Sequence, residues 1–246
     1  MIRIGTAGWS IPASIRERFP VEGSTLQRYA TQFDAVEINS SFYRPHKPET
    51  YARWAASTPE GFRFAIKLPK AITHDRRLVD IVEPLERFLA ETSALGDKRG
   101  PILIQLPPSL QFDPTAAEAF FERFRKRHDG EAALEPRHAS WFSADSDTLM
   151  IRHRIGRVAG DPALCPQAAA PGGWTGFSYW RLHGSPRTYA TEYGPARIAA
   201  VAQELGPDAW VIFDNTMFGA ATQDALLLKA AVNPLRSRNP DAKLGP

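Results

Sequence analysis

Short apolar segments alternate with amphipathic helical patterns along the chain, and this alternation constrains the fold more than any other feature. A strand followed by a helix and then by another strand favours parallel pairing of the strands. Eight such apolar segments are present, at residues 2–8, 35–39, 63–68, 102–106, 132–136, 157–161, 178–184 and 210–215. Eight repeats of this kind predict an α/β fold of the (β/α)8 type, a TIM-type barrel with eight parallel strands.

The segments between the strands indicate where the helices lie. Apolar residues recur at steps of three and four, as in amphipathic helices, at residues 25–33, 49–57, 78–96, 115–127 and 194–206. The segment after Asp161, "PALCPQAAAPGGWTG", lacks this period, so the sixth helix is expected to be irregular or missing. We expect one barrel domain over residues 1–246, with a loosely ordered tail at 233–246.

Composition limits the class of protein. The chain is 43% hydrophobic and 23% charged, which is ordinary for a protein that buries a core. It contains no apolar run of about 18–20 residues, and its start lacks the layout of a signal peptide. A single cysteine, Cys165, excludes an internal disulfide and a cysteine-based zinc site. A cytoplasmic monomer without membrane association is therefore expected.

The net charge of +3 gives little reason to expect a nucleic-acid partner. The densest basic run, "RFRKRHD" at 123–129, is typical of the polar face of a helix, and one solvated helix is a weak basis for phosphate-backbone binding.

Polar side chains occupy the last positions of the expected strands. In a barrel of this type, the strand-to-helix loops gather at one face, where active sites are built. Since side chains alternate along a strand, Glu37 and Asn39 share a face, as do Arg181 and His183. We therefore predict that one pocket holds the strand-end residues Glu37, Lys67, Gln105, Glu135, Asp161, Arg181 and Asn215.

Three carboxylates, Glu37, Glu135 and Asp161, are the candidate catalytic residues. Adjacent strands lie about 4.8 Å apart, so Glu135 and Asp161 are expected to repel each other and raise one pKa, leaving an acid and a base at neutral pH. This division suits hydrolysis or isomerisation of a sugar-like or phosphorylated substrate. The predicted substrate-binding residues are Trp9, Asn39, Phe42, Lys67, His74, Gln105, Arg137, His138, Trp141, Arg181, His183, Tyr189 and Asn215.

Other interpretations stay open. Lys67, Arg137 and Arg181 form a cationic set that suits a small anionic ligand or a nucleic-acid fragment, without catalysis. His183 with the carboxylates forms a possible divalent-metal set, but the nearby cations argue against one, so no metal and no cofactor are predicted. Lys67 could form a Schiff base if its pKa were lowered. The same charged residues could also form a structural layer of ion pairs.

A set of motifs resembles the YecE-like family, catalogued as domain of unknown function 72. They are "GTAGW" at 5–9, "YATQFDAVEINSSFYRP" at 29–45, "FRFAIKLPKAITH" at 62–74, "ILIQLPPS" at 102–109, "LEPRHASWF" at 134–142, "YWRLHG" at 179–184 and "VIFDNTMFGAATQDA" at 211–225. The resemblance implies a TIM-type barrel and a pocket at its C-terminal face, but no reaction. This chain has Asp214-Asn215 where the family more often has Asn-Asn, so the resemblance does not support an ionised, catalytic Asp214. It also reads "EPRH" where the family tends to read "EFRH".

Overall fold

The computed structural model describes residues 1–237. Its strands are β1 (Arg3–Thr6), β2 (Ala35–Ile38), β3 (Arg63–Lys67), β4 (Arg99–Gln105), β5 (Ala132–Glu135), β6 (Gly156–Arg157), β7 (Ala159–Asp161), β8 (Gly172–Gly173), β9 (Ser178–Leu182) and β10 (Ala209–Phe213). Its α-helices are α1 (Thr25–Tyr29), α2 (Pro48–Ala56), α3 (Val82–Thr92), α4 (Pro114–Arg125), α5 (Ala144–Arg152), α6 (Pro195–Glu204) and α7 (Ala220–Ser237). Within this part of the chain, no helix has both the length and the apolar character needed to cross a membrane.

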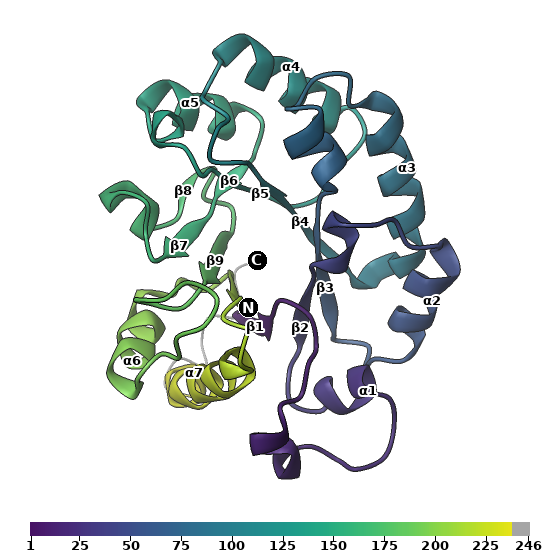
Figure 1. The fold of residues 1–246 in the computed structure, drawn as a ribbon, viewed down its shortest axis with the longest axis vertical. Coiled ribbons are helices and arrows are strands. Elements are labelled where there is room, and N and C mark those ends of the chain that lie inside the picture. The colour runs from purple at the N-terminus through teal and green to yellow at the C-terminus, as the bar shows by residue number, and fades with distance from the viewer. Residues whose placement is uncertain (238–246) are drawn as a thin grey trace, which may run out of the picture.

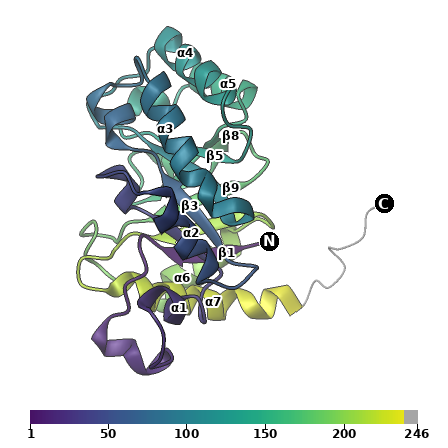
Figure 2. The ribbon, with the colours of Figure 1, turned by 90° about the vertical axis from the view of Figure 1, so that its right-hand side faces the viewer.

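The strands form a mixed α/β fold with two sheets. One sheet has the order β1-β10-β9-β7 and is parallel throughout. The other has the order β2-β3-β4-β5-β6-β8, in which only β8 runs antiparallel to its neighbour. An isolated parallel bridge between Ala7 and Glu37 joins the two sheets. The helices lie around the outside of the strands (Figure 1), and α2 and α3 cover β3 in the side view (Figure 2).

Each of the eight apolar segments identified in the sequence contains a strand, and the five expected helices correspond to α1, α2, α3, α4 and α6. Two further helices, α5 and α7, follow the fifth and eighth apolar segments, as a (β/α)8 pattern with only the sixth helix missing requires. The helix α5 begins with polar residues after the Ser143 cap, and α7 buries Ala221, Ala225, Leu228 and Val232 at steps of three and four residues. After Asp161, the chain forms a 3-10 turn at Pro166–Ala169 and the short strand β8.

The tail expected at 233–246 falls partly on α7, which continues to Ser237. Residues 238–246 lie outside the described part of the chain.

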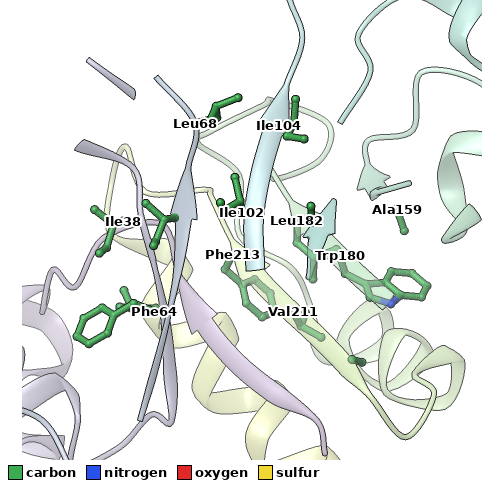
Figure 3. Packing of buried hydrophobic residues seen from close by; sticks show 14 of the residues in the cluster. Ile38, Phe64, Leu68, Ile102, Ile104, Ala159, Trp180, Leu182, Val211 and Phe213 are labelled. Atoms are coloured by element: carbon green, nitrogen blue, oxygen red, sulfur yellow. The ribbon is translucent and has the colours of Figure 1, made fainter. Parts of the chain in front are cut away.

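Alternate side chains of the strands enter two different apolar clusters. The outer cluster lies between the strands and the helices, and Figure 3 shows part of it: Ile38, Phe64, Leu68, Ile102, Ile104, Ala159, Trp180, Leu182, Val211 and Phe213. The inner cluster occupies the opposite face of the strands and contains Ala35, Ala65, Leu103, Ala133, Val158, Phe177, Tyr179, Trp210 and Ile212. Because the face alternates at every residue, membership of these clusters decides where the next polar side chain points.

Packing of the outer cluster supplies much of the stability of the fold. The three phenylalanines of α4, Phe120, Phe121 and Phe124, are each fully buried. Full burial of one such side chain stabilises a protein by about 1.5–3 kcal/mol. The helix begins at the Asp113 cap, whose side chain accepts hydrogen bonds from the backbone amides of Thr115 and Ala116.

Candidate functional site

Arg181 is the centre of a buried charge network on the inner face of the strands. Its side chain is 0% exposed and lies two residues after Tyr179 of the inner cluster. Nε and Nη2 donate to the two carboxylate oxygens of Glu37 at 3.1 and 2.8 Å, and Nη1 donates to Glu135 Oε2 at 2.8 Å. Nη2 also reaches Asp214 Oδ2 at 3.0 Å. Burial alone would lower the pKa of Arg181, but the surrounding carboxylates raise it well above its ordinary value.

Glu135 receives more donors than any other carboxylate of this network. Gln105 Nε2 and Arg137 Nη2 each donate to it at 2.8 Å, in addition to Arg181. His183 Nε2 lies 2.8 Å from Glu135 Oε1, and its Nδ1 lies 3.1 Å from Asp214 Oδ2. Burial opposes ionisation of Glu135, but Arg181, Arg137 and His183 hold its pKa well below the usual range. The predicted carboxylic acid with a raised pKa is therefore not found at Glu135.

Asp161 lies on the other face of its strand, which corrects its predicted place beside Glu135. In the strand register, Gly160 pairs with Arg181, whereas Asp161 pairs with Leu182 of the outer cluster. The Asp161 carboxylate accepts hydrogen bonds from Arg197 of α6, with Nε at 2.9 Å and Nη2 at 2.7 Å. Asp161 and Arg197 thus form an ion pair between β7 and α6.

The predicted place of Asn215 in the pocket is also wrong. Its Nδ2 donates to Asp224 Oδ2 of α7 at 2.7 Å and to Thr191 O at 2.9 Å. These bonds tie the loop before α6 to the start of α7. The neighbouring residue, Asp214, is the one that faces Arg181. Burial opposes its ionisation too, yet Arg181 and His183 lower its pKa.

Above the network lies a cavity of about 600 Å³ at the carboxyl ends of the strands. Its lining residues come from the loops after β2, β3, β9 and β10 and from the end of β4: Asn39, Phe42, Tyr43, Lys67, Lys70, His74, Asp75, Gln105, Tyr189, Asp214, Thr216 and Met217. Six residues predicted to bind substrate are among them, namely Asn39, Phe42, Lys67, His74, Gln105 and Tyr189. Gln105 and Asp214 also belong to the charge network, so they connect it to the cavity.

Lys67 is the residue of this cavity with the most unusual environment. It is 5% exposed, and its Nζ lies 4.3 Å from the centre of the Phe42 ring. Within residues 1–237, no hydrogen bond or ion pair joins Nζ to another residue. Burial and then the charge of Arg181 lower the pKa of Lys67, against the opposing effect of Glu37, Glu135 and Asp214.

Two further groups of the cavity have open hydrogen-bonding capacity. The amide oxygen of Asn39 is buried and has no partner among the described residues. His74 uses Nδ1 in a 2.8 Å hydrogen bond with Thr73 Oγ1, and its ring packs edge-on against Phe42 at 5.0 Å. Burial and then the charge of Lys67 lower the pKa of His74.

Three predicted substrate-binding residues are used elsewhere in the structure. Trp9 packs edge-on against Trp54 at 5.0 Å and lines a separate hollow beside α1 and α2. His138 caps the turn Ala139–Trp141, where its Nδ1 accepts from the Ser140 amide at 3.2 Å. Trp141 is 1% exposed, and its Nε1 donates to Leu110 O at 2.9 Å. Their polar atoms and rings complete local packing, so they do not reach the cavity.

Tyr179 and Asp214 were missed as site residues. The Tyr179 hydroxyl donates to Glu37 Oε2 at 2.9 Å and completes the carboxylate's hydrogen bonding. Alternation along β9 could have identified Tyr179, because it precedes the predicted Arg181 by two residues, whereas β10 is apolar on both faces and leaves the choice between Asp214 and Asn215 open.

The possible divalent-metal set is not assembled. Glu37 accepts from Arg181 through both oxygens, and Asp161 binds Arg197. Across residues 1–237, no group of three or more His, Cys, Asp or Glu side chains is arranged to hold a metal ion.

Comparisons with known proteins agree with this architecture. A family described as "Protein of unknown function DUF72" matches residues 3–244. The UPF0759 protein YecE of Escherichia coli K12 is 33% identical over 157 residues, which are 63% of this chain and 55% of YecE. The chain thus spans about half the length of the curated relatives it matches.

Solved structures of two DUF72 family proteins have a similar fold. The protein from Enterococcus faecalis V583 has a TM-score of 0.78 at 22% identity, covering 95% of this chain and 96% of that one. The protein from Thermotoga maritima MSB8 has a TM-score of 0.75 at 24% identity, covering 94% and 98%. At these identities, the likeness concerns the fold alone.

Proposed function

The chain belongs to the DUF72 family, and we propose that it acts as an enzyme on a small anionic substrate held in the cavity above Arg181. The family is described as one of unknown function, so the proposal is argued from the residues of the cavity.

The first part of the proposal is that the two sheets form one closed (β/α)8 barrel. The Ala7–Glu37 bridge supports closure between β1 and β2. On the other side, residues 156–161 pair with β5 through β6 and with β9 through β7, and the Val158 amide donates to Leu134 O at 2.9 Å. A closed barrel would place the cavity at its C-terminal face, where enzymes of this fold carry their active sites.

The observation that carries the function is the uncompensated amino group of Lys67. A buried ammonium without a directly bonded carboxylate or other hydrogen-bond acceptor is unfavourable, and Lys67 is in this position at the wall of a cavity. The carboxylates nearby are held by Arg181, Arg137 and His183. An anionic group of a ligand would supply the missing partner, and the exposed Lys70 at the same cavity would add to the attraction.

The network below the cavity then has a positioning role. Glu37 and Glu135, predicted as catalytic carboxylates, are saturated with donors from Arg181 and its neighbours, so neither is available as a general acid. Their ion pairs hold Arg181 in place, and burial followed by the charge of Arg181 lowers the pKa of Lys67. We therefore assign the reactive role to Lys67. The second candidate is an anion-binding protein without catalysis, which the same cationic lining favours.

Thermal melts in the presence of small anions test the proposal. Inorganic phosphate, glycerol 3-phosphate and pyruvate are the probes, with glycerol as a neutral comparison and sodium chloride to match ionic strength. A ligand at one hundred times its Kd stabilises by about 2.7 kcal/mol, which corresponds to a rise in Tm of about 5 °C for a chain of 246 residues.

The matched variants are Lys67→Met and Lys126→Met. Lys126 caps the C-terminal end of α4 and lines no part of the cavity. We expect the anion-induced rise in Tm to disappear in Lys67→Met and to persist in Lys126→Met. The proposal fails if no anion stabilises the wild type, or if Lys67→Met responds like the wild type.

A further inference from the structure

We propose that Lys67 reacts covalently, forming an imine between Nζ and the carbonyl carbon of an anionic aldehyde or ketone. The inference rests on the proposed function, which brings a small anion into the cavity, and it defines the substrate class as a carbonyl compound that carries a carboxylate or a phosphate.

Nζ of Lys67 has no hydrogen-bonding partner among the described residues, which is unusual for a buried lysine. Lys98 shows the ordinary arrangement, because its Nζ donates to Ala55 O and Thr58 O, both at 2.6 Å. Lys67 has no such acceptor within residues 1–237, although only 5% of it is exposed. Since its exposed part lines the cavity, a carbonyl group can approach Nζ only from there.

The surroundings of Lys67 also suit the charge of the product. A protonated imine carries one positive charge, as the lysine ammonium does, so the site must tolerate a cation in either form. The Phe42 ring, 4.3 Å from Nζ, offers its face to such a cation. Glu37, Glu135 and Asp214 act in the same direction.

The lowered pKa of Lys67 makes the unprotonated amine easier to form. Burial and Arg181 lower the pKa of Lys67, and the neutral amine is the nucleophile. A sequence-based argument would expect the neighbouring glutamates to keep this lysine charged. In the structure, burial of Lys67 and the charge of Arg181, which pairs with both glutamates, together outweigh the glutamates' effect on the pKa of Lys67.

The covalent step balances without an external oxidant or reductant. The Nζ lone pair attacks the carbonyl carbon, the new C–N bond forms, and the carbonyl oxygen takes a proton to give a carbinolamine. Nitrogen loses a proton, the C–O bond breaks, and the hydroxyl leaves as water after accepting a proton. The net change is amine plus carbonyl plus one proton to protonated imine plus water.

His74 is placed to carry these protons. Its ring and Nζ of Lys67 both contact the Phe42 ring, and His74 lines the same cavity. Because Nδ1 bonds to Thr73, Nε2 is the ring nitrogen left for exchange with the substrate. Near neutral pH, the lowered pKa keeps the imidazole in the neutral form that accepts a proton.

The remaining open groups indicate what else the substrate carries. The unpartnered amide oxygen of Asn39 requires a donor such as a hydroxyl group. Lys70, which is 49% exposed and 4.0 Å from Asp75, is a loosely engaged cation suited to the anionic end. A cavity of about 600 Å³ suits a small molecule of this kind. A hydroxy-keto acid or a sugar phosphate has this chemistry.

Reductive trapping tests the inference. The protein is incubated with pyruvate or with dihydroxyacetone phosphate in the presence of sodium cyanoborohydride, which reduces an imine to a stable secondary amine. We expect one adduct per chain by intact mass, located on Lys67 by peptide mapping. Comparison of the two probes distinguishes a keto acid from a sugar phosphate as the source of the carbonyl.

Two lysine-to-arginine variants provide the controls. Lys67→Arg keeps the positive charge but lacks a reactive amine, so it should lose the adduct while retaining anion-induced thermal stabilisation. Lys126→Arg, at the exposed end of α4 and outside the cavity, should still be labelled at Lys67. If labelling is spread over exposed lysines, or if Lys67→Arg is labelled as strongly as the wild type, the inference is overturned.

The failure of the two proposals can be told apart. Anion-induced stabilisation of the wild type without any adduct overturns the imine and leaves the anionic substrate in place. Absence of both stabilisation and adduct overturns both.

Discussion

Replacing Glu135 with glutamine tests whether the charge network is a tightly coupled structural unit. The glutamate accepts hydrogen bonds at 2.8 Å from Arg181, Arg137 and Gln105. A glutamine keeps one acceptor oxygen, but its amide group then faces a cation, and one buried arginine loses its counter-charge. Removing one partner of a buried ion pair costs about 3–5 kcal/mol.

This cost converts into a measurable change in Tm. The entropy of unfolding is about 2.1 cal/mol/K per residue, which is about 0.5 kcal/mol/K for 246 residues. The Glu135→Gln variant should therefore melt about 6–10 °C below the wild type at pH 7. Differential scanning calorimetry measures this shift directly.

The pH dependence identifies the cause. The folded-state pKa of Glu135 lies well below the ordinary value of 4.5, so its stabilising contribution is complete above about pH 4.5 and is lost as the pH falls through the folded-state pKa. The gap between the two proteins should narrow at acidic pH. Glu118→Gln is the control, because Glu118 pairs with Arg152 at the surface. Loss of this exposed pair should lower the free energy of unfolding by less than about 1 kcal/mol. If the Tm of Glu135→Gln lies within about 1 °C of the Tm of Glu118→Gln, the reasoning is refuted.

Three further substitutions test other parts of the structure. Asp224→Asn should stabilise the protein by up to about 3 kcal/mol at pH 8, because burial raises the pKa of Asp224 to about 6 and both of its hydrogen bonds use one oxygen that asparagine can replace. The contribution of Asp224 to the stability of the wild type falls as pH rises from about 4 to 6, so chemical denaturation should show no gain in the variant near pH 4. Gly5→Ala should cost about 3 kcal/mol or more, since the added Cβ would lie 2.2 Å from Ala35 O, whereas Gly61→Ala meets nothing within 4 Å and should unfold like the wild type. Asp161→Asn should leave anion-induced stabilisation unchanged in thermal melts, because this carboxylate pairs with Arg197; loss of the response would return Asp161 to the site.

Local patterns in the sequence determined the secondary structure and the end of the strands that carries the cavity. Each strand and the stronger helices have a short apolar period that is set by neighbouring residues. The loops after β2 and β3 contain the polar and aromatic residues Asn39, Phe42 and His74, and these line the cavity as expected.

The face of the strand on which each strand-end side chain lies was harder to predict from the sequence. Strands covered on both faces are apolar throughout, so hydrophobic alternation does not reveal their phase. For this reason "RVAGD" did not indicate that Val158 and Gly160 share the inner face while Asp161 faces α6. The same ambiguity led to Asn215 in place of Asp214.

Only the tertiary structure decided which charges are paired and which are left open. Tyr179 and Arg181 meet Glu37 across more than 140 positions of the chain, and no local pattern encodes that distance. Arg181 pairs with Glu37, Glu135 and Asp214 together. Lys67, which the sequence predicts to lie in the same pocket as the two glutamates, therefore forms no direct ion pair with them. The types of residue at the site follow from the sequence. Their protonation and availability follow from which of them come within hydrogen-bonding distance when the strands assemble, because both depend on burial and on neighbouring charge.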